Sequence, residues 1–113
     1  MKSSTTPDFW TAYHALPQNV RELARKNYRL WQENAAHPSL RWKQLAPGLW
    51  SVRIGLKYRA LARVRENTAY WFWIGTHNEF DNIITQFISD RYPMIAKRSY
   101  FPYREVTRLE GSA

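Results

Sequence analysis

The sequence predicts an α+β domain: two N-terminal helices packed on a three- to four-stranded, mainly antiparallel sheet, followed by a C-terminal helix or extension. Two observations support this prediction. Apolar side chains recur at helical spacing within residues 7–33, and residues 40–75 change to an alternation with a period of two. A length of 113 residues with 44% hydrophobic residues is enough for one domain with a core. We expect residues 1–90 to form this domain and residues 91–113 to be an extension of unknown role.

The first helix is expected to begin after Thr6. Threonine is a good N-cap, Pro7 suits the first helical position, and Asp8 complements the helix dipole. Pro17 then breaks the run or opens a second helix, expected over 18–33. Its apolar face consists of Val20, Leu23, Ala24, Tyr28 and Trp31. The basic residues between them are more typical of a solvated helix face than of a nucleic-acid contact, and the two helices are expected to form an antiparallel hairpin.

The strands are expected from Ser39 onward, where the period changes to two. Ala46, Pro47 and Gly48 form a turn between the first strand and a second strand over 50–55. Further strands are expected over 58–65 and 69–75, and the last is nearly all apolar, as in a strand covered on both faces. A helix is expected over about 79–89. Residues 1–6 are polar and could be either a frayed end or a short edge strand.

The stretch 49–77 has two different faces, because successive side chains of a strand point to opposite sides. One set is apolar or aromatic: Trp50, Val52, Ile54, Leu56, Tyr58, Ala60, Ala62 and Val64. The other set is almost purely basic: Ser51, Arg53, Gly55, Lys57, Arg59, Leu61, Arg63 and Arg65. The sequence therefore predicts a sheet with a core on one side and a solvent-exposed cationic surface on the other.

The composition favours a polyanionic partner. The chain has 17 Lys and Arg against 9 Asp and Glu, a formal net charge of +8. Nucleic acid, an acidic protein and an anionic membrane surface all fit this charge. The chain has no cysteine, so disulfides and thiolate metal sites are excluded. We expect no membrane span, no secretory signal and a cytoplasmic location, because no long apolar run is present. The three histidines share no ligand spacing, so no metal or other cofactor is expected.

The basic residues suit one reaction that needs no cofactor, the cleavage of RNA by its own 2′-hydroxyl. Arg53 and Arg59 can stabilise charge on the phosphorane, and His77, just past the last strand, can act as acid or base. However, an alternating Arg/Lys face is more often a binding surface than a catalytic one, and a lone histidine after a strand is more often a polar turn residue. From the residues alone, binding of nucleic acid or an acidic protein ranks first and catalysis second.

Four segments resemble the RelE/ParE superfamily of bacterial toxins, the toxin halves of type II toxin–antitoxin modules: LPQNVRELARKNYRLWQEN, HPSLRWKQL, LWSVRIGLKYRAL and YWFWIGTHNEFD. The resemblance covers roughly residues 7–85. It implies a small sheet carrying two N-terminal helices, and an antitoxin that wraps the toxin and covers its basic groove. In the RelE-like branch it also implies cleavage of messenger RNA in the ribosomal decoding site.

The resemblance also implies roles for individual residues. Arg53 matches a catalytic lysine of a central strand, Arg59 matches an arginine that contacts the reacting phosphate, and His77 stands where RelE-like members often carry an arginine. The expected RNA-binding residues are Arg41, Lys43, Lys57, Arg63, Glu79 and Phe80. Ser51 departs from the RelE pattern, which has a second strand lysine here, and the nearest aromatic to the family's stacking tyrosine is Phe80, which lacks a hydroxyl.

These departures keep two alternatives open. The ParE branch inhibits DNA gyrase without known hydrolytic chemistry, and the chain could also be a basic binding module without activity. Residues 86–113 lie outside the resemblance. Their aromatic residues stand among arginines and lysines, which could be an RNA- or partner-binding tail. A plain extension explains the same pattern and is slightly favoured.

Overall fold

The computed structural model describes residues 1–91, except the side chains of Phe87 and Arg91. The described residues divide into two units at Gly75/Thr76, and the first unit contains the sheet except Thr76, the last residue of β5. The expected C-terminal tail therefore lies largely outside the described residues. In chain order the elements are β1 (Lys2–Thr5), α1 (Pro7–His14), α2 (Gln18–Glu33), η1 (Pro38–Leu40), β2 (Lys43–Ala46), β3 (Leu49–Ile54), β4 (Tyr58–Arg65), β5 (Thr68–Thr76) and α3 (His77–Arg91).

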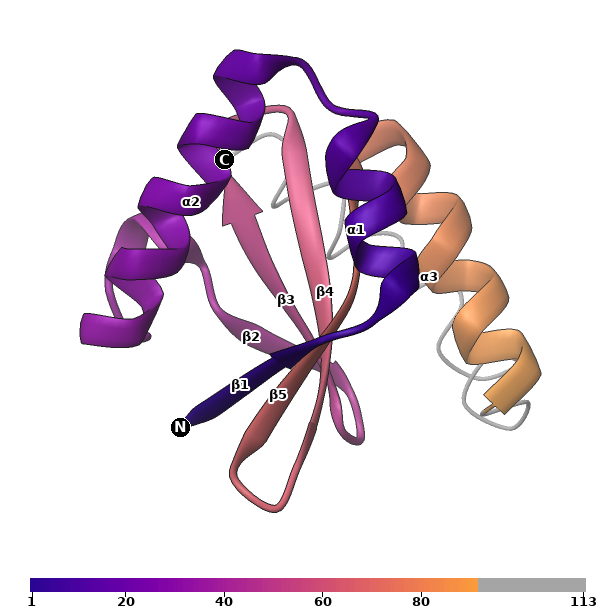
Figure 1. The fold of residues 1–113 in the computed structure, drawn as a ribbon. Coiled ribbons are helices and arrows are strands. Elements are labelled where there is room, and N and C mark those ends of the chain that lie inside the picture. Colours follow the sequence, from indigo (N-terminus) through magenta and orange to yellow (C-terminus); the bar gives the residue numbers. More distant parts are fainter. Residues whose placement is uncertain (92–113) are drawn as a thin grey trace. The chain divides into compact units, whose positions relative to one another are not determined.

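The sheet has five strands in the order β1-β5-β4-β3-β2 (Figure 1). β2, β3 and β4 pair antiparallel, whereas β1 runs parallel to β5. The α+β prediction is confirmed, but the expected three to four strands were too few. The extra strand is the polar N-terminus, which pairs through its backbone and is anchored where Trp71 Nε1 donates to Ser3 Oγ at 3.0 Å. Because backbone pairing does not require apolar side chains, the pattern of residues 1–6 did not distinguish a strand from a frayed end.

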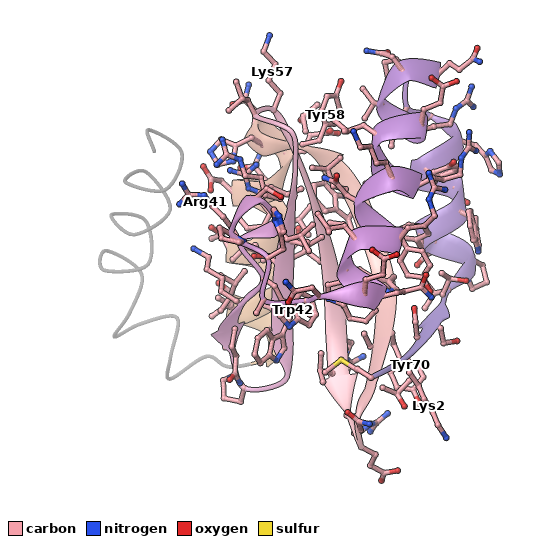
Figure 2. All side chains as sticks on the ribbon, turned by 90° about the vertical axis from the view of Figure 1, so that its left-hand side faces the viewer. Lys2, Arg41, Trp42, Lys57, Tyr58 and Tyr70 are labelled. Carbon is pink, nitrogen blue, oxygen red and sulfur yellow. The ribbon has the colours of Figure 1, made fainter. Side chains whose placement is uncertain are left out.

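Both N-terminal helices form where the sequence predicted them. The Thr6 cap is confirmed, since Thr6 Oγ1 accepts a hydrogen bond from the Phe9 N–H at 3.2 Å. Figure 2 shows α1 and α2 on the same side of the sheet. There they bury one set of alternate strand side chains, Val52, Ile54, Ala60 and Ala62, in the main hydrophobic core. We call this set the helix-covered face.

Two element boundaries differ from the prediction. The segment after Ser39 is first a 3-10 turn, η1, and β2 begins only at Lys43. Leu40 is fully buried and anchors this turn, and Arg41 then takes a left-handed backbone conformation (φ 47°) that a strand cannot continue through. α3 begins at His77, two residues earlier than expected. Thr76 Oγ1 accepts from the Glu79 N–H, and Glu79 Oε1 accepts from the Thr76 N–H, which is a capping box.

The other set of strand side chains, Ser51, Arg53, Arg59, Leu61 and Arg63, forms the cationic face. The prediction that this face is open to solvent was wrong at its centre, where Ser51 is 3% exposed and Arg59 is 7% exposed. Period-two alternation shows which side chains share a face, but not whether that face is covered. Leu56 was also misplaced: it is 77% exposed because Gly55 turns the chain with φ 63° and interrupts the alternation. No described helix is long and apolar enough to cross a membrane.

Candidate functional site

The fold brings four cationic side chains together, three from different strands and one, Arg41, from the segment before β2. Arg53 of β3 lies directly opposite Arg59 of β4, and Lys43 of β2 lies opposite Ser51 of β3. The charges of Arg59 and Arg41 both act on the Lys43 ammonium, so these side chains are close to it. In Figure 2, Arg41 lies on the side of the sheet away from α1 and α2. We call Arg41, Lys43, Arg53 and Arg59 the cationic cluster.

Hydrogen bonds to the backbone hold two of the three arginines of the cluster. Arg53 Nε donates to the Gly55 carbonyl at 3.0 Å, and Arg59 Nη1 donates to the Tyr58 carbonyl at 2.9 Å. The backbone under Arg53 is fixed in turn by α2, because Asn27 Nδ2 donates to the Arg53 carbonyl at 3.2 Å. The guanidinium groups are therefore positioned before any ligand arrives, which lowers the entropy cost of binding.

Lys43 is the electrostatically perturbed member of the cluster. Burial, followed by the charges of Arg59 and Arg41, lowers the pKa of its ammonium from 10.5 to about 8, and its Nζ is buried. Like charges gathered in a partly desolvated place raise the free energy of the protein, and a bound anion offsets that cost. Lowering the pKa toward neutrality also lets an amine exchange protons with a substrate. The cluster is thus suited to a phosphate group and to proton transfer beside it.

Two cations among the expected RNA-binding residues lie outside the cluster. Lys57 is exposed in the turn between β3 and β4, and it is labelled in Figure 2. Arg63 is exposed and lies opposite Leu49, four residues along β4 from Arg59 and therefore roughly 13 Å away along the strand. Arg63 is therefore too far along the strand to share a phosphate with Arg59, but it can reach a neighbouring part of an extended polyanion.

The remaining expected site residues, His77, Glu79 and Phe80, belong to the second unit. The rings of His77 and Phe80 stack, with centroids 6.0 Å apart, and Phe80 is buried. Backbone and side-chain hydrogen bonds from Thr76 lower the pKa of the Glu79 carboxyl, so Glu79 is ionised as a helix cap at neutral pH. In the described part of the chain, no group of three or more acidic or histidine side chains could hold a metal ion.

Sequence reasoning missed the tuning of Lys43 and the buried setting of Arg59. The placement of Lys43 depends on the pairing of β2 with β3, which contains a bulge between Gln44 and Ala46. The short turn at residues 47–48 signals a hairpin, but no residue in β2 signals the bulge. An aromatic cavity between the helices and the helix-covered face was also missed, because its residues come from six separate elements of the chain.

The fold is similar to that of chains in two solved antitoxin–toxin complexes. One similar chain comes from the RelB–RelE complex of Methanococcus jannaschii, with TM-score 0.59 and 13% identity over 71% of this chain and 96% of that chain. Another comes from the RelBE2 toxin–antitoxin complex of Mycobacterium tuberculosis, with TM-score 0.51 and 20% identity over 66% of this chain and 95% of that chain. At these identities the similarity shows the fold alone.

The family follows from the sequence itself. Residues 18–82 match the model of the ParE-like toxin domain, and this match spans more than half of the chain. The chain therefore belongs to the ParE-like toxin family, within the RelE/ParE superfamily that the four sequence segments resemble. Comparison with curated proteins gives no match.

Proposed function

We propose that this toxin inhibits translation by cleaving messenger RNA on the ribosome through attack of the RNA 2′-hydroxyl. The observation that supports this proposal is the cationic cluster, in which Arg53 and Arg59 face each other across two strands next to a lysine of lowered pKa. Fixed cations aimed at developing charge contribute about 100- to 1,000-fold each to such a reaction.

In the proposed reaction the 2′-oxygen forms a bond to phosphorus while the bond from phosphorus to the 5′-oxygen breaks. The products are a 2′,3′-cyclic phosphate and a 5′-hydroxyl. A base takes the 2′-hydroxyl proton and an acid gives a proton to the leaving oxygen. Arg53 and Arg59 stabilise the phosphorane, and His77 is proposed as the acid or base. Lys43 is a second proton carrier because its pKa of about 8 leaves part of the amine neutral near physiological pH.

The proposed partners are an antitoxin protein, the ribosome and messenger RNA. The similar structures are antitoxin–toxin complexes, which supports an antitoxin for this chain as well. A net charge of +8 favours an acidic antitoxin segment and an RNA surface for the same electrostatic reason. The remaining proposed RNA contacts are Arg41, Lys57, Arg63, Glu79 and Phe80.

Inhibition of DNA gyrase without hydrolysis is the second candidate function. The matched family model is that of the ParE-like toxin domain. Ser51, moreover, supplies no cation on β3 beside Arg53. In that case the cationic cluster would bind an acidic surface of gyrase rather than the phosphates of RNA.

Induced expression with mapping of new RNA 5′ ends tests the two candidates against each other. Sharp, translation-dependent cuts bearing 5′-hydroxyls support mRNA cleavage. Intact messages with gyrase-linked DNA breaks would refute mRNA cleavage and favour gyrase inhibition. Arg59→Ala should relieve toxicity while antitoxin binding persists. Arg65→Ala is the matched control, since Arg65 is exposed at the far end of the same strand. If Arg59→Ala and His77→Ala are both as toxic as the wild type, the site assignment is wrong.

A further inference from the structure

An exposed aromatic side chain, Tyr70 of β5, lies on the same side of the sheet as the cationic face. Its neighbours Ala69 and Trp71 are buried in the main core, and successive side chains of a strand point to opposite sides. Tyr70 is 39% exposed. Figure 2 labels Tyr70 and Lys57 at opposite ends of the sheet. The sequence did not single out this tyrosine, because nearly every other side chain of β5 is apolar.

The turn between β4 and β5 determines which residue lies opposite Tyr70. The two strands are joined by residues 66–67 alone, which have φ of 52° and 60°. Two turn residues with positive φ are typical of a type I′ hairpin turn. In that hairpin Arg63 lies directly opposite Tyr70, with their Cβ atoms about 5 Å apart. The same register pairs Ala62 with Trp71, and both are buried in the main core, as this register requires.

The strand on the other side of Tyr70 leaves its ring open. β1 pairs with β5 in a register that puts Ser4 beside Tyr70. Ser4 is exposed, and a serine side chain is too short to cover a tyrosine ring. Arg63 is also exposed, and its guanidinium is always charged. The three strands therefore present a flat aromatic surface beside a permanent positive charge.

This pair of residues extends the side of the sheet that carries the cationic cluster. Arg63 and Arg59 belong to β4 and are separated by roughly 13 Å along the strand. A nucleic acid strand with one phosphate at Arg59 can therefore place a nearby nucleotide at Arg63. Proteins hold single-stranded nucleic acid by stacking bases on aromatic rings and binding phosphates with cations. An acidic protein would use the guanidinium of Arg63 but not the ring of Tyr70.

We propose that Tyr70 and Arg63 form a nucleotide-binding subsite for single-stranded RNA. A base stacks on the Tyr70 ring, and the Arg63 guanidinium binds an adjoining phosphate. As a substrate subsite it rests on the proposed cleavage of RNA, and it assigns to Tyr70 a contact with a nucleotide away from the reacting phosphate. Tyr70 is thus a substrate-binding residue and not a catalytic one.

The test is binding of the full-length protein to a fluorescein-labelled octamer of 2′-O-methyluridine, measured by fluorescence anisotropy without ribosomes. This RNA cannot be cleaved, because a methyl group blocks its 2′-oxygen. Tyr70→Ala should weaken binding at least about fivefold, as expected when one stacked base loses its ring. Tyr70→Phe keeps the ring and should bind like the wild type. Tyr28→Ala is the matched control, since Tyr28 is 38% exposed on α2 and should not contribute.

Two further measurements separate stacking from charge. Arg63→Gln should reduce the slope of log K against log salt by about 0.7, the contribution of one phosphate of a single strand. Tyr70→Ala should leave that slope unchanged. A matched strand of abasic spacers has the same phosphates and no bases. The wild type should bind it less tightly than the octamer, and Tyr70→Ala should reduce this preference.

Urea unfolding shows whether each variant is folded. If Tyr70→Ala is not, Tyr70→Thr takes its place, because threonine favours strands and has no ring. The proposal is overturned if the wild type shows no saturable binding of the octamer, if Tyr70→Ala binds as tightly as Tyr28→Ala, or if the abasic strand binds equally well. It is also overturned if Arg63→Gln alone weakens binding, as a surface for an acidic protein would require. Mapping of RNA 5′ ends judges the cleavage separately, so either proposal can fail while the other stands.

Discussion

The two faces of the central strands are both buried at their centres but differ there in chemistry. On the helix-covered face, Val52, Ala60 and Ala62 are buried and apolar. On the cationic face, Ser51 and Arg59 are just as buried, yet they are polar and charged. Arg59 and Ala60 are neighbours in one strand, yet the first is a buried charge on the cationic face and the second is a buried apolar residue in the core. One face holds the fold together, and the other concentrates charge.

The difference shows how one short strand combines stability with function. Burial of apolar surface against α1 and α2 stabilises the first unit. Holding cations together on the cationic face opposes folding. At Lys43 this cost is visible in the lowered pKa of the ammonium, which burial causes first and the charges of Arg59 and Arg41 second. Charged groups that are kept together against their mutual repulsion are typical of sites where an oppositely charged ligand binds. The following predictions test this division, from the largest expected effect to the smallest.

Exchanging the chemistry of the helix-covered face should have the largest effect. Ala62→Arg places a charge at a fully buried position of the core and should cost more than about 4 kcal/mol, enough to unfold most domains. Circular dichroism and urea unfolding measure this change. Arg63→Ala, one residue further and exposed, should stay within about 0.5 kcal/mol of the wild type. If both substitutions lowered the free energy of unfolding equally, the two faces would not differ in their contribution to stability.

Removing a cation from the cationic face should instead act on activity. Arg59→Ala should lower the rate of ribosome-dependent mRNA cleavage by about 100- to 1,000-fold, because a fixed cation at the phosphorane is lost. A reconstituted translation complex with a 5′-labelled message gives the rate. Arg65→Ala should cleave like the wild type. Should Arg59→Ala cleave normally while remaining folded, the cationic face would have no part in the chemistry.

The pH dependence of stability should show the electrostatic cost of Lys43. Its folded pKa of about 8 lies below the unfolded value of 10.5, so below pH 8 the ammonium is present in both states and its penalty is complete. Between pH 8 and 10.5 the unfolded chain retains the proton more strongly, so stability rises, and above 10.5 the penalty is gone. Lys43→Met should therefore stabilise the protein at pH 7.

Urea unfolding of the wild type and Lys43→Met at pH 7 and near pH 10 measures this difference. The gain from the substitution should shrink at the higher pH. Lys57→Met is the matched control, because Lys57 is exposed and should show little change at either pH. A gain for Lys43→Met that is the same at both pH values would mean that packing, and not charge, causes it.

The smallest effect is expected from the cap of α1, which supports the helix-covered face from outside. Thr6→Ala removes the acceptor of the Phe9 N–H and should cost about 1 kcal/mol in the free energy of unfolding. Thr11→Ala, in the middle of the same helix and exposed, should cost nothing or stabilise slightly, because alanine is the better helix former. Urea unfolding distinguishes the two, and a reversed order would show that the cap does not stabilise the helix.

Local chemistry made most of the fold predictable. The Thr6 cap, the helical spacing of α2 and the alternation in β3 and β4 act within a few residues of chain, and all three elements form as expected. β1 was left undecided because its pairing with β5 connects the N-terminus to residues 68–71. This strand pairing depends on the tertiary arrangement, and the pattern of polar side chains in β1 does not indicate it.

The candidate site was predictable as a set of cations but not as an arrangement. The sequence by itself determined which side chains share a strand face, because alternation is a property of the backbone. It placed Arg53 and Arg59 together for that reason. The tertiary structure decided that Lys43 joins these arginines, through the β-bulge between Gln44 and Ala46. If the same residues paired without a bulge, a regular ladder continued from Ala46 and Leu49 would put Lys43 opposite Val52 on the helix-covered face.

With the bulge, Lys43 lies opposite Ser51 and joins the arginines. A one-residue shift of register exchanges the two faces of a strand, and only the pairing of strands in three dimensions fixes that register. The covalent chain thus determined the charges and the helices. The packing of β2 on β3 decided that Lys43 lies on the cationic face, where burial and then the charges of Arg59 and Arg41 lower the pKa of its ammonium toward neutrality.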